Sequence, residues 1–263
     1  MTQFTHLDKG KIKQSFGAAA SSYDQLAGLQ RQVGRDLLSL FPPVETDGWV
    51  MDLGCGTGFL TRQLLKINQQ QSLLAVDIAL PMLTAARQKN SLDSQIAYLC
   101  ADAENLALTA GSMQQIYSNL ALQWCENLPA VFRRCRCLLQ SDGQLVFATF
   151  GPKTLQELKA AWAQVDSYDH VNQFYTQADV VGFLAEAGFT DVRAESRMYQ
   201  HQYRTVLELM HELKGIGAHN VSLGRKRKPT TRSQLQQMME SYRQTMLDDK
   251  VLASYEIILV RAR

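Results

Sequence analysis

The sequence has no apolar run that approaches the ~18 residues needed to cross a membrane. Its N-terminus lacks the apolar segment of a secretory leader, and five cysteines, an odd number, argue against a disulfide framework. It contains neither H-E-x-x-H nor C-x-x-C, and Cys135 and Cys137 would point in different directions from a helix. These absences predict a cytoplasmic protein with no membrane partner and no metal site.

The sequence also lacks internal repeats, and its formal charge of +2 over 263 residues is small. The charge is unevenly spread, however. Residues 193–232 carry nine basic and three acidic side chains, a formal +6, against 18 basic and 22 acidic side chains elsewhere. This basic stretch indicates either an acidic partner or a solvated loop. A nucleic acid is the less favoured partner, because the overall charge is modest.

The chain between residues 49 and 149 alternates strand and helix patterns. Apolar residues recur with helical spacing between Leu128 and Leu139, and Pro81 stands where a helix would begin. Such alternation predicts a doubly wound, mostly parallel α/β sheet with helices on both faces. Short apolar runs predict its strands at residues 49–53, 73–77, 96–100, 115–119 and 144–149, and later ones at 191–203 and 255–261.

Helical segments flank this core. An apolar stripe from Leu26 to Leu40 predicts an N-terminal helix that ends at Pro42, whereas the small residues at 15–24 favour a mobile loop. After residue 149 the spacing predicts helices, one of them started by a capping box of Thr176 and Asp179. The predicted helices lie at 155–165, 176–187, 206–214 and 233–247, with Gly188 as the residue after the second.

We therefore expect a single domain with four parts. They are an N-terminal helical cap (1–45), an α/β core (46–200), a helical insertion over the active site (204–250) and a final strand (251–263).

The motif M-D-L-G-C-G-T-G at 51–58 follows the first predicted strand. Alternate glycines allow positive φ and a close approach of the backbone to a ligand, at the edge where open α/β sheets bind ligands. A nicotinamide enzyme would carry a further glycine at Phe59. Asp77, at the end of the second strand, can accept hydrogen bonds from both hydroxyls of a ribose. Nicotinamide enzymes also have an acid at this place, so Asp77 alone does not identify the cofactor.

The D-L-G-C-G-T-G pattern resembles motif I of class I S-adenosylmethionine methyltransferases. The resemblance implies that Asp102 and Ala103 lie at the adenine and Asn119 at the methyl-transfer site. With the motif and its neighbours, the expected cofactor-binding residues are Asp52, Gly54, Cys55, Gly56, Gly58, Asp77, Ile78, Met82, Asp102, Ala103, Asn119 and Leu120.

Five longer blocks resemble the malonyl-acyl carrier protein O-methyltransferases of biotin synthesis. They are SFGAAASSYDQLAGLQRQVG (15–34), MDLGCGTG (51–58), SNLALQWC (118–125), FATFGPKTLQEL (147–158) and HELKGIGAHN (211–220), and the ending YEIILVRAR is similar too. This resemblance implies methylation of the free carboxylate of a malonyl thioester, held on acyl carrier protein or CoA. The ester hides the charge and lets the product prime pimeloyl and biotin synthesis.

A malonyl carboxylate, with a pKa of ~4, is ionised at neutral pH, so no general base is required. We expect Tyr23, Asn119, Gln123 and Trp124 at the reacting group. Phe150, His219 and Asn220 are candidates for binding the rest of the substrate. The carrier is acidic in this family, so the run Arg225, Lys226, Arg227 and Lys228 is its expected docking site.

Three rival functions remain at this stage. They are a methyltransferase for another small carboxylate or a quinone, a nicotinamide oxidoreductase, and a cofactor-binding protein without activity.

Overall fold

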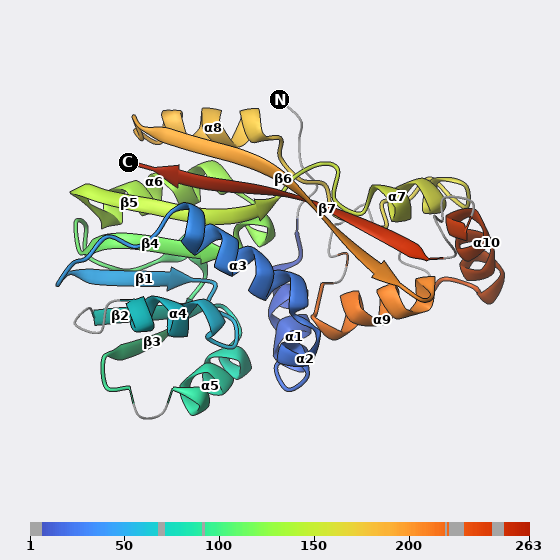
Figure 1. Cartoon of the computed structure of the whole chain (residues 1–263), viewed down its shortest axis with the longest axis horizontal. Coiled ribbons are helices and arrows are strands. Elements are labelled where there is room, and N and C mark those ends of the chain that lie inside the picture. The colour runs from blue at the N-terminus through green and yellow to red at the C-terminus, as the bar shows by residue number, and fades with distance from the viewer. Residues whose placement is uncertain (1–6, 68–71, 91–92, 219, 221–228, 244–249) are drawn as a thin grey trace.

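The computed structural model describes residues 7–67, 72–90, 93–218, 220, 229–243 and 250–263. Its centre is a seven-stranded sheet in the order β3-β2-β1-β4-β5-β7-β6, in which β7 runs in the direction opposite to the other six strands (Figure 1). The strands are β1 Trp49–Leu53, β2 Ser72–Asp77, β3 Ile96–Cys100, β4 Met113–Asn119, β5 Leu139–Phe150, β6 Val192–Tyr203 and β7 Val251–Ala262.

Helices cover both faces of this sheet and extend beyond one end of it (Figure 1). They are α1 Lys9–Ala19, α2 Tyr23–Leu26, α3 Gly28–Leu40, α4 Phe59–Ile67, α5 Leu80–Lys89, α6 Leu128–Leu138, α7 Gln156–Ala163, α8 Gln177–Glu186, α9 Val206–Gly215 and α10 Arg232–Arg243, with the 3-10 turns η1 Ala103–Asn105 and η2 Leu122–Trp124. No helix in the described part of the chain is long and apolar enough to span a bilayer.

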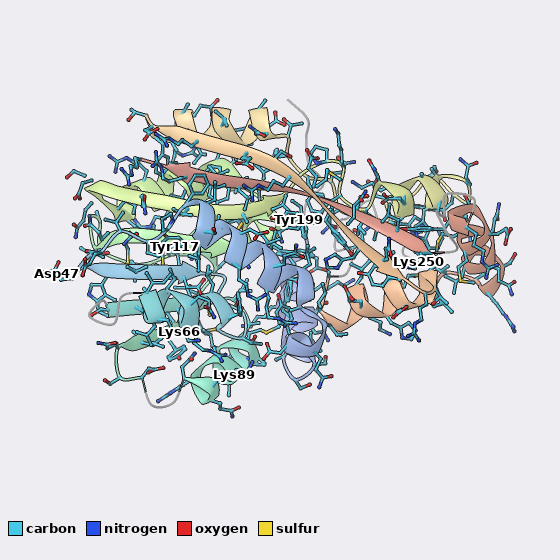
Figure 2. All side chains as sticks on the ribbon, in the orientation of Figure 1. Asp47, Lys66, Lys89, Tyr117, Tyr199 and Lys250 are labelled. Carbon is cyan, nitrogen blue, oxygen red and sulfur yellow. The ribbon has the colours of Figure 1, made fainter. Side chains whose placement is uncertain are left out.

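The alternation of side chains along each strand produces two cores. In β1, Val50 faces the core under α3 and α4, whereas Met51 and Leu53 face the core under α6 and α8. Tyr117, which belongs to the first core, is fully buried, whereas Asp47 and Lys66, also labelled in Figure 2, are exposed. Burial on both faces explains why these strands are continuous apolar runs in the sequence.

The fold class predicted from the sequence is confirmed, including the helical insertion before the last strand. Pro81 lies in the first turn of α5, and Thr176 and Asp179 form the capping box of α8. Gly188 follows α8 with φ +91°. The division into four parts stays a prediction.

The expected mobile loop at residues 15–24 is wrong, because α1 and α2 occupy most of it. The side chain of Asp8 accepts a hydrogen bond from the backbone N–H of Lys11 (3.1 Å) and so caps α1. The alanines that suggested a loop are good helix formers, and Ala19 packs against Ala79 and Met82 near the start of α5.

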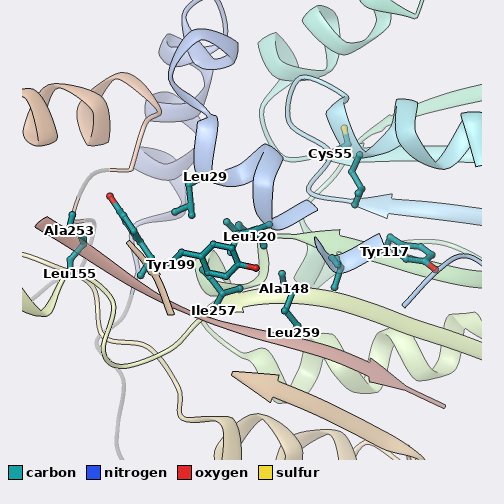
Figure 3. Packing of buried hydrophobic residues seen from close by; sticks show 14 of the residues in the cluster. Leu29, Cys55, Tyr117, Leu120, Ala148, Leu155, Tyr199, Ala253, Ile257 and Leu259 are labelled. Atoms are coloured by element: carbon teal, nitrogen blue, oxygen red, sulfur yellow. The ribbon is translucent and has the colours of Figure 1, made fainter. Parts of the chain in front are cut away.

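The last two strands are longer than the sheet they join. Residues 257–262 of β7 pair with β5, but residues 251–256 pair only with β6, which leaves a two-stranded ribbon. Helices α7, α9 and α10 surround this ribbon at one end of the molecule (Figure 1). The buried cluster that begins near Cys55 continues through Leu120 to Leu155 and Ala253, so ribbon and sheet share one core (Figure 3).

Candidate active site

The three glycines after β1 all have positive φ, but their surroundings differ. A methyl group on Gly54 would overlap the Cβ of Ala121, and one on Gly58 would lie 3.0 Å from the Cβ of Ala86. At Gly56 the nearest atom would be Cε1 of Tyr23, 4.0 Å away, so the backbone there faces open space. Gly54 and Gly58 therefore serve packing, and Gly56 leaves room for a ligand.

This turn lies at the topological switch point of the sheet. The strand order reverses between β1 and β4, so the turn after β1 lies beside the segment after β4, where open α/β sheets bind ligands. A cavity of about 720 Å³ occupies this position. Among its lining residues are many of the predicted ones: Tyr23, Gly54, Gly56, Asp77, Ile78, Met82, Asp102, Ala103, Asn119, Leu120 and Trp124.

Asp77 connects the turn to the end of β2. Its carboxylate accepts hydrogen bonds from the backbone N–H groups of Gly56 (2.9 Å) and Ala79 (2.8 Å). Burial raises the pKa of Asp77, and these backbone donors oppose that rise. Each oxygen retains a further lone pair with which it can accept a ligand hydroxyl.

Helix α1 closes over the other end of the cavity through Lys9, which the sequence analysis did not identify. Its ammonium donates to both carboxylate oxygens of Asp102 (2.9 and 3.0 Å) and also pairs with Glu104. Burial opposes protonation of Lys9, but the two carboxylates raise its pKa above the usual value. The predicted adenine residue Asp102 is thus held by α1, whose C-terminal part was expected to be a loop.

Two buried oxygen atoms beside the turn have no hydrogen-bond donor among the described residues. Asp52 accepts from the Thr61 hydroxyl through Oδ2 (2.6 Å), but its Oδ1 has no donor. Asn119 donates to the carbonyl of Gln30 (2.8 Å), while its own Oδ1 has none. Burial raises the pKa of Asp52 to about 7.

Both residues line a second cavity of about 430 Å³, together with Cys55, Gly56 and Arg31. Two unsatisfied acceptors suit a ligand ammonium, and the guanidinium of Arg31 suits a ligand carboxylate. The cavity therefore fits the two charged groups of an amino acid. Arg31 was missed because its position in α3, next to this cavity, depends on how that helix packs.

A third cavity, of about 810 Å³, joins the first at the side chains they share, which include Phe16, Tyr23 and Trp124. We call it the substrate chamber. Its walls come from α1, α2 and α3, the segment after β4, the end of β5, residues 154–158 and 170–174, α9 and the segment after it, and the ribbon. Phe16 and Trp124 meet edge to face (centroids 5.3 Å apart), and Phe150 packs against Phe174 (5.4 Å).

Tyr23 is the described residue that lines all three cavities. Burial, and then the charges of Asp77 and Asp24, raise the pKa of its hydroxyl well above the usual range. Tyr23 therefore keeps its proton at neutral pH and can act as a hydrogen-bond donor.

The remaining predicted substrate residues divide into two groups. Gln123, Phe150 and Asn220 line the substrate chamber; Gln123 donates to the carbonyl of Leu120 (2.6 Å) and Asn220 to that of Asp169. His219, Arg225, Lys226, Arg227 and Lys228 lie outside the described residues.

Comparisons with known proteins find methyltransferases. A family model described as a methyltransferase domain matches residues 51–147. A malonyl-acyl carrier protein O-methyltransferase of Methylococcus capsulatus is 40% identical over 256 residues, which cover 95% of this chain and 92% of that protein.

A biotin biosynthesis bifunctional protein, BioHC, of Cellvibrio japonicus is 38% identical over 97% of this chain, which spans 50% of that longer protein. Among solved structures, a phosphoethanolamine N-methyltransferase 2 of Haemonchus contortus in complex with S-adenosyl-L-methionine has a TM-score of 0.59 at 14% identity. That match covers 94% of this chain and 57% of the other, and it shows a common fold.

Proposed function

The chain belongs to the family of malonyl-acyl carrier protein O-methyltransferases, and we propose that it methylates the free carboxylate of a malonyl thioester on acyl carrier protein. The observation that carries this proposal is the junction of two kinds of cavity. One has buried acceptors and an arginine that suit the amino-acid end of S-adenosylmethionine, and the other is a largely apolar chamber that suits an acyl group. The product ester has lost the carboxylate charge and can prime pimeloyl and biotin synthesis.

The described residues fit the cofactor along its whole length. Asp52 and Asn119 would accept from the ammonium, and Arg31 would bind the carboxylate. Asp77 would accept from the ribose hydroxyls, and Asp102 with Ala103 would border the adenine. Gly56 supplies the space in which the backbone can approach the cofactor.

When bound, S-adenosylmethionine would supply a methyl group on a positive sulfur, which the carboxylate oxygen would accept with its own lone pair while the carbon–sulfur electron pair stayed on sulfur. The protein has to orient the carboxylate and exclude water from it. Tyr23 would donate to the carboxylate, and Phe16, Trp124 and Phe150 would exclude water around it. No residue has to remove a proton, since the carboxylate is already ionised.

The carrier protein and the location of the reaction belong to the same proposal. The run Arg225, Lys226, Arg227 and Lys228 would attract an acidic carrier and steer the acyl group toward the chamber. A cytoplasmic location agrees with the five cysteines, none of which is in a disulfide.

The proposal is tested by incubating the protein with methyl-labelled S-adenosylmethionine and one acceptor at a time. We expect label in malonyl-carrier, less in malonyl-CoA and least in free malonate, with none in acetyl-carrier, which lacks the carboxylate. Transfer to a quinone or another small carboxylate in preference to the thioesters would overturn the proposal. Cofactor binding without any transfer would indicate a binding protein instead.

A further inference from the structure

A histidine in the wall of the substrate chamber is held on two sides. The ring of His170 stacks flat on Trp162 of α7, with centroids 3.8 Å apart and planes inclined by 3°. Its Nε2 lies 2.8 Å from Oδ1 of Asp166, and its side chain is 14% exposed. Stacking fixes the plane of the ring and the carboxylate fixes its rotation, so the other ring nitrogen has a set direction.

The partner of Nε2 determines what Nδ1 can do. An ionised carboxylate only accepts hydrogen bonds, so Nε2 carries the proton that points at Asp166. Oδ1 of Asp166 also accepts from the backbone N–H of Tyr168 (3.1 Å), which holds the carboxylate in place. Nδ1 has no partner among the described residues, and it becomes a donor when the ring is protonated.

The charges around the cavities single out this histidine. Among the described residues that line the substrate chamber there is no lysine and no arginine, and His170 is the one side chain that can become positive. Lys9, which lines the first cavity, is engaged with Asp102 and Glu104. Arg31, which lines the second, donates to the carbonyl of Asp24 (2.5 Å) and is assigned to the cofactor carboxylate. A buried substrate carboxylate is therefore without a positive partner unless His170 provides one.

The chamber also contains a negative group. Glu212 of α9 lines it and accepts a hydrogen bond from the Tyr203 hydroxyl (2.7 Å). A substrate carboxylate is repelled by Glu212 and attracted by a protonated His170, so the two residues together favour one orientation of an acyl group that is charged at one end.

We infer that His170, held by Asp166 and Trp162, binds the carboxylate of the acyl substrate through Nδ1 when its ring carries both protons, in addition to the Tyr23 hydroxyl. This inference rests on the proposed function and names the residue that selects a carboxylate-bearing thioester.

One carboxylate oxygen accepts from Nδ1 and the other remains for methylation. The pair of Asp166 and protonated His170 has no net charge. It therefore orients the carboxylate without neutralising it as strongly as an isolated arginine would.

The test compares two ligands that differ in the carboxylate alone. Binding of malonyl-CoA and of acetyl-CoA is measured by calorimetry in the presence of S-adenosylhomocysteine, which prevents turnover. The variant His170→Phe keeps an aromatic ring on Trp162 but has no N–H. We expect it to bind malonyl-CoA about 30-fold more weakly and acetyl-CoA within about twofold of the wild type, as for loss of one charged hydrogen bond.

Two further variants complete the test. His211→Phe makes the same change at an exposed histidine of α9 and should alter neither affinity. Asp166→Asn weakens the hydrogen bond that orients His170 and should reduce the affinity for malonyl-CoA about tenfold. This variant tests the inference if His170→Phe does not fold.

If His170→Phe lost affinity equally for both thioesters, or lost none for malonyl-CoA, the assignment of His170 would be overturned. A wild-type protein that binds malonyl-CoA but transfers no methyl group to any malonyl thioester would instead overturn the proposed function. The two failures are therefore distinguishable.

Discussion

The cofactor cavities and the substrate chamber meet at Tyr23 but are built in different ways. The centre of the cofactor side is a short turn after β1 and the ends of β2 and β4, all at one edge of the sheet. The substrate side brings together segments from α1 to β7, more than 200 residues apart in the chain. The first is fixed by local backbone geometry, whereas the second depends on how helices and the ribbon pack.

Backbone strain differs between the glycine turn and the substrate chamber. In the turn after β1 the positive φ angles belong to glycines, which adopt them without steric cost. Two leucines also have positive φ, a conformation that costs about 1–2 kcal/mol per residue: Leu155 in the chamber wall, and Leu120, which lines both the chamber and the first cavity. Their backbone N–H groups bond to the carbonyls of Ala148 (2.9 Å) and Ser254 (2.6 Å), which hold them in place. A substitution on the cofactor side should therefore reduce the turnover of every substrate equally. The effect of a substitution in the chamber should differ from one substrate to another.

The largest effect is expected from Gly54→Ala. The added methyl group would overlap Ala121, and the positive φ would strain the new residue. We expect cofactor affinity to fall more than about 100-fold, with a lower Tm, since the turn and the segment after β4 must separate. Calorimetry with S-adenosylmethionine and thermal unfolding would measure both.

Gly111→Ala is the matched control for this change. Gly111 also has positive φ (+65°), but nothing lies within 4 Å of its added methyl group. Gly111→Ala should lower the Tm only through the strain of an alanine at positive φ, and it should leave the affinity for the cofactor unchanged. A similar loss of affinity in both variants would mean that overlap with Ala121 is not the cause.

The next largest effect concerns the ionisation of Asp52. Because its pKa is raised to about 7 by burial, pairing with a ligand ammonium requires loss of a proton near neutral pH. We expect cofactor affinity to be about 20-fold weaker at about pH 5.5 than at about pH 7.5. Asp52→Asn should bind weakly at both values, and an unchanged pH dependence in that variant would exclude Asp52 as the cause.

The same group makes the ligand-free protein less stable as pH rises. A folded-state pKa above the usual 3.8 means that the folded protein binds the proton more tightly than the unfolded chain. The stability that Asp52 contributes is therefore full below about pH 4 and is lost as the pH rises to about 7. Tm values measured across this range should show this decline in the wild type and a smaller one in Asp52→Asn, in which Asp77, whose pKa is also raised, still titrates.

A smaller effect is expected from Tyr23→Phe, at the junction of the two regions. The hydroxyl keeps its proton and lines the substrate chamber, and in the proposed function it donates to the substrate carboxylate. We expect turnover of malonyl thioesters to fall about tenfold, the loss expected for one hydrogen bond, with the Tm nearly unchanged. Tyr168→Phe, at a tyrosine that is 50% exposed, is the control. Unchanged turnover would remove Tyr23 from the site.

The smallest effect belongs to the basic run of Arg225, Lys226, Arg227 and Lys228. Replacing all four with Gln should raise the KM for malonyl-carrier about two- to fivefold at low salt, and leave the KM for malonyl-CoA less affected. High salt should reduce the difference between variant and wild type. A KM for malonyl-carrier that does not respond to salt would exclude electrostatic docking through this run.

The parts of the structure that were predicted correctly share one property, which is that their signals are local. Continuous apolar runs mark strands buried on both faces, and alternate glycines mark a turn with positive φ. The prediction of a loop at residues 15–24 was wrong because small residues suit either a loop or a helix, and the packing of Ala19 against α5 decided between them.

The sequence by itself determined the order of strands and helices, the glycine turn and the position of Asp77, because spacing and backbone conformation are properties of neighbouring residues. Only the tertiary structure placed Lys9 on Asp102, Arg31 beside Asp52, and His170 on Trp162 in the substrate chamber. Lys9 and Asp102, and likewise Arg31 and Asp52, lie on separate elements, and no spacing in the chain shows that a side chain faces a cavity. Their places are set by the packing of helices and ribbon around the edge of the sheet.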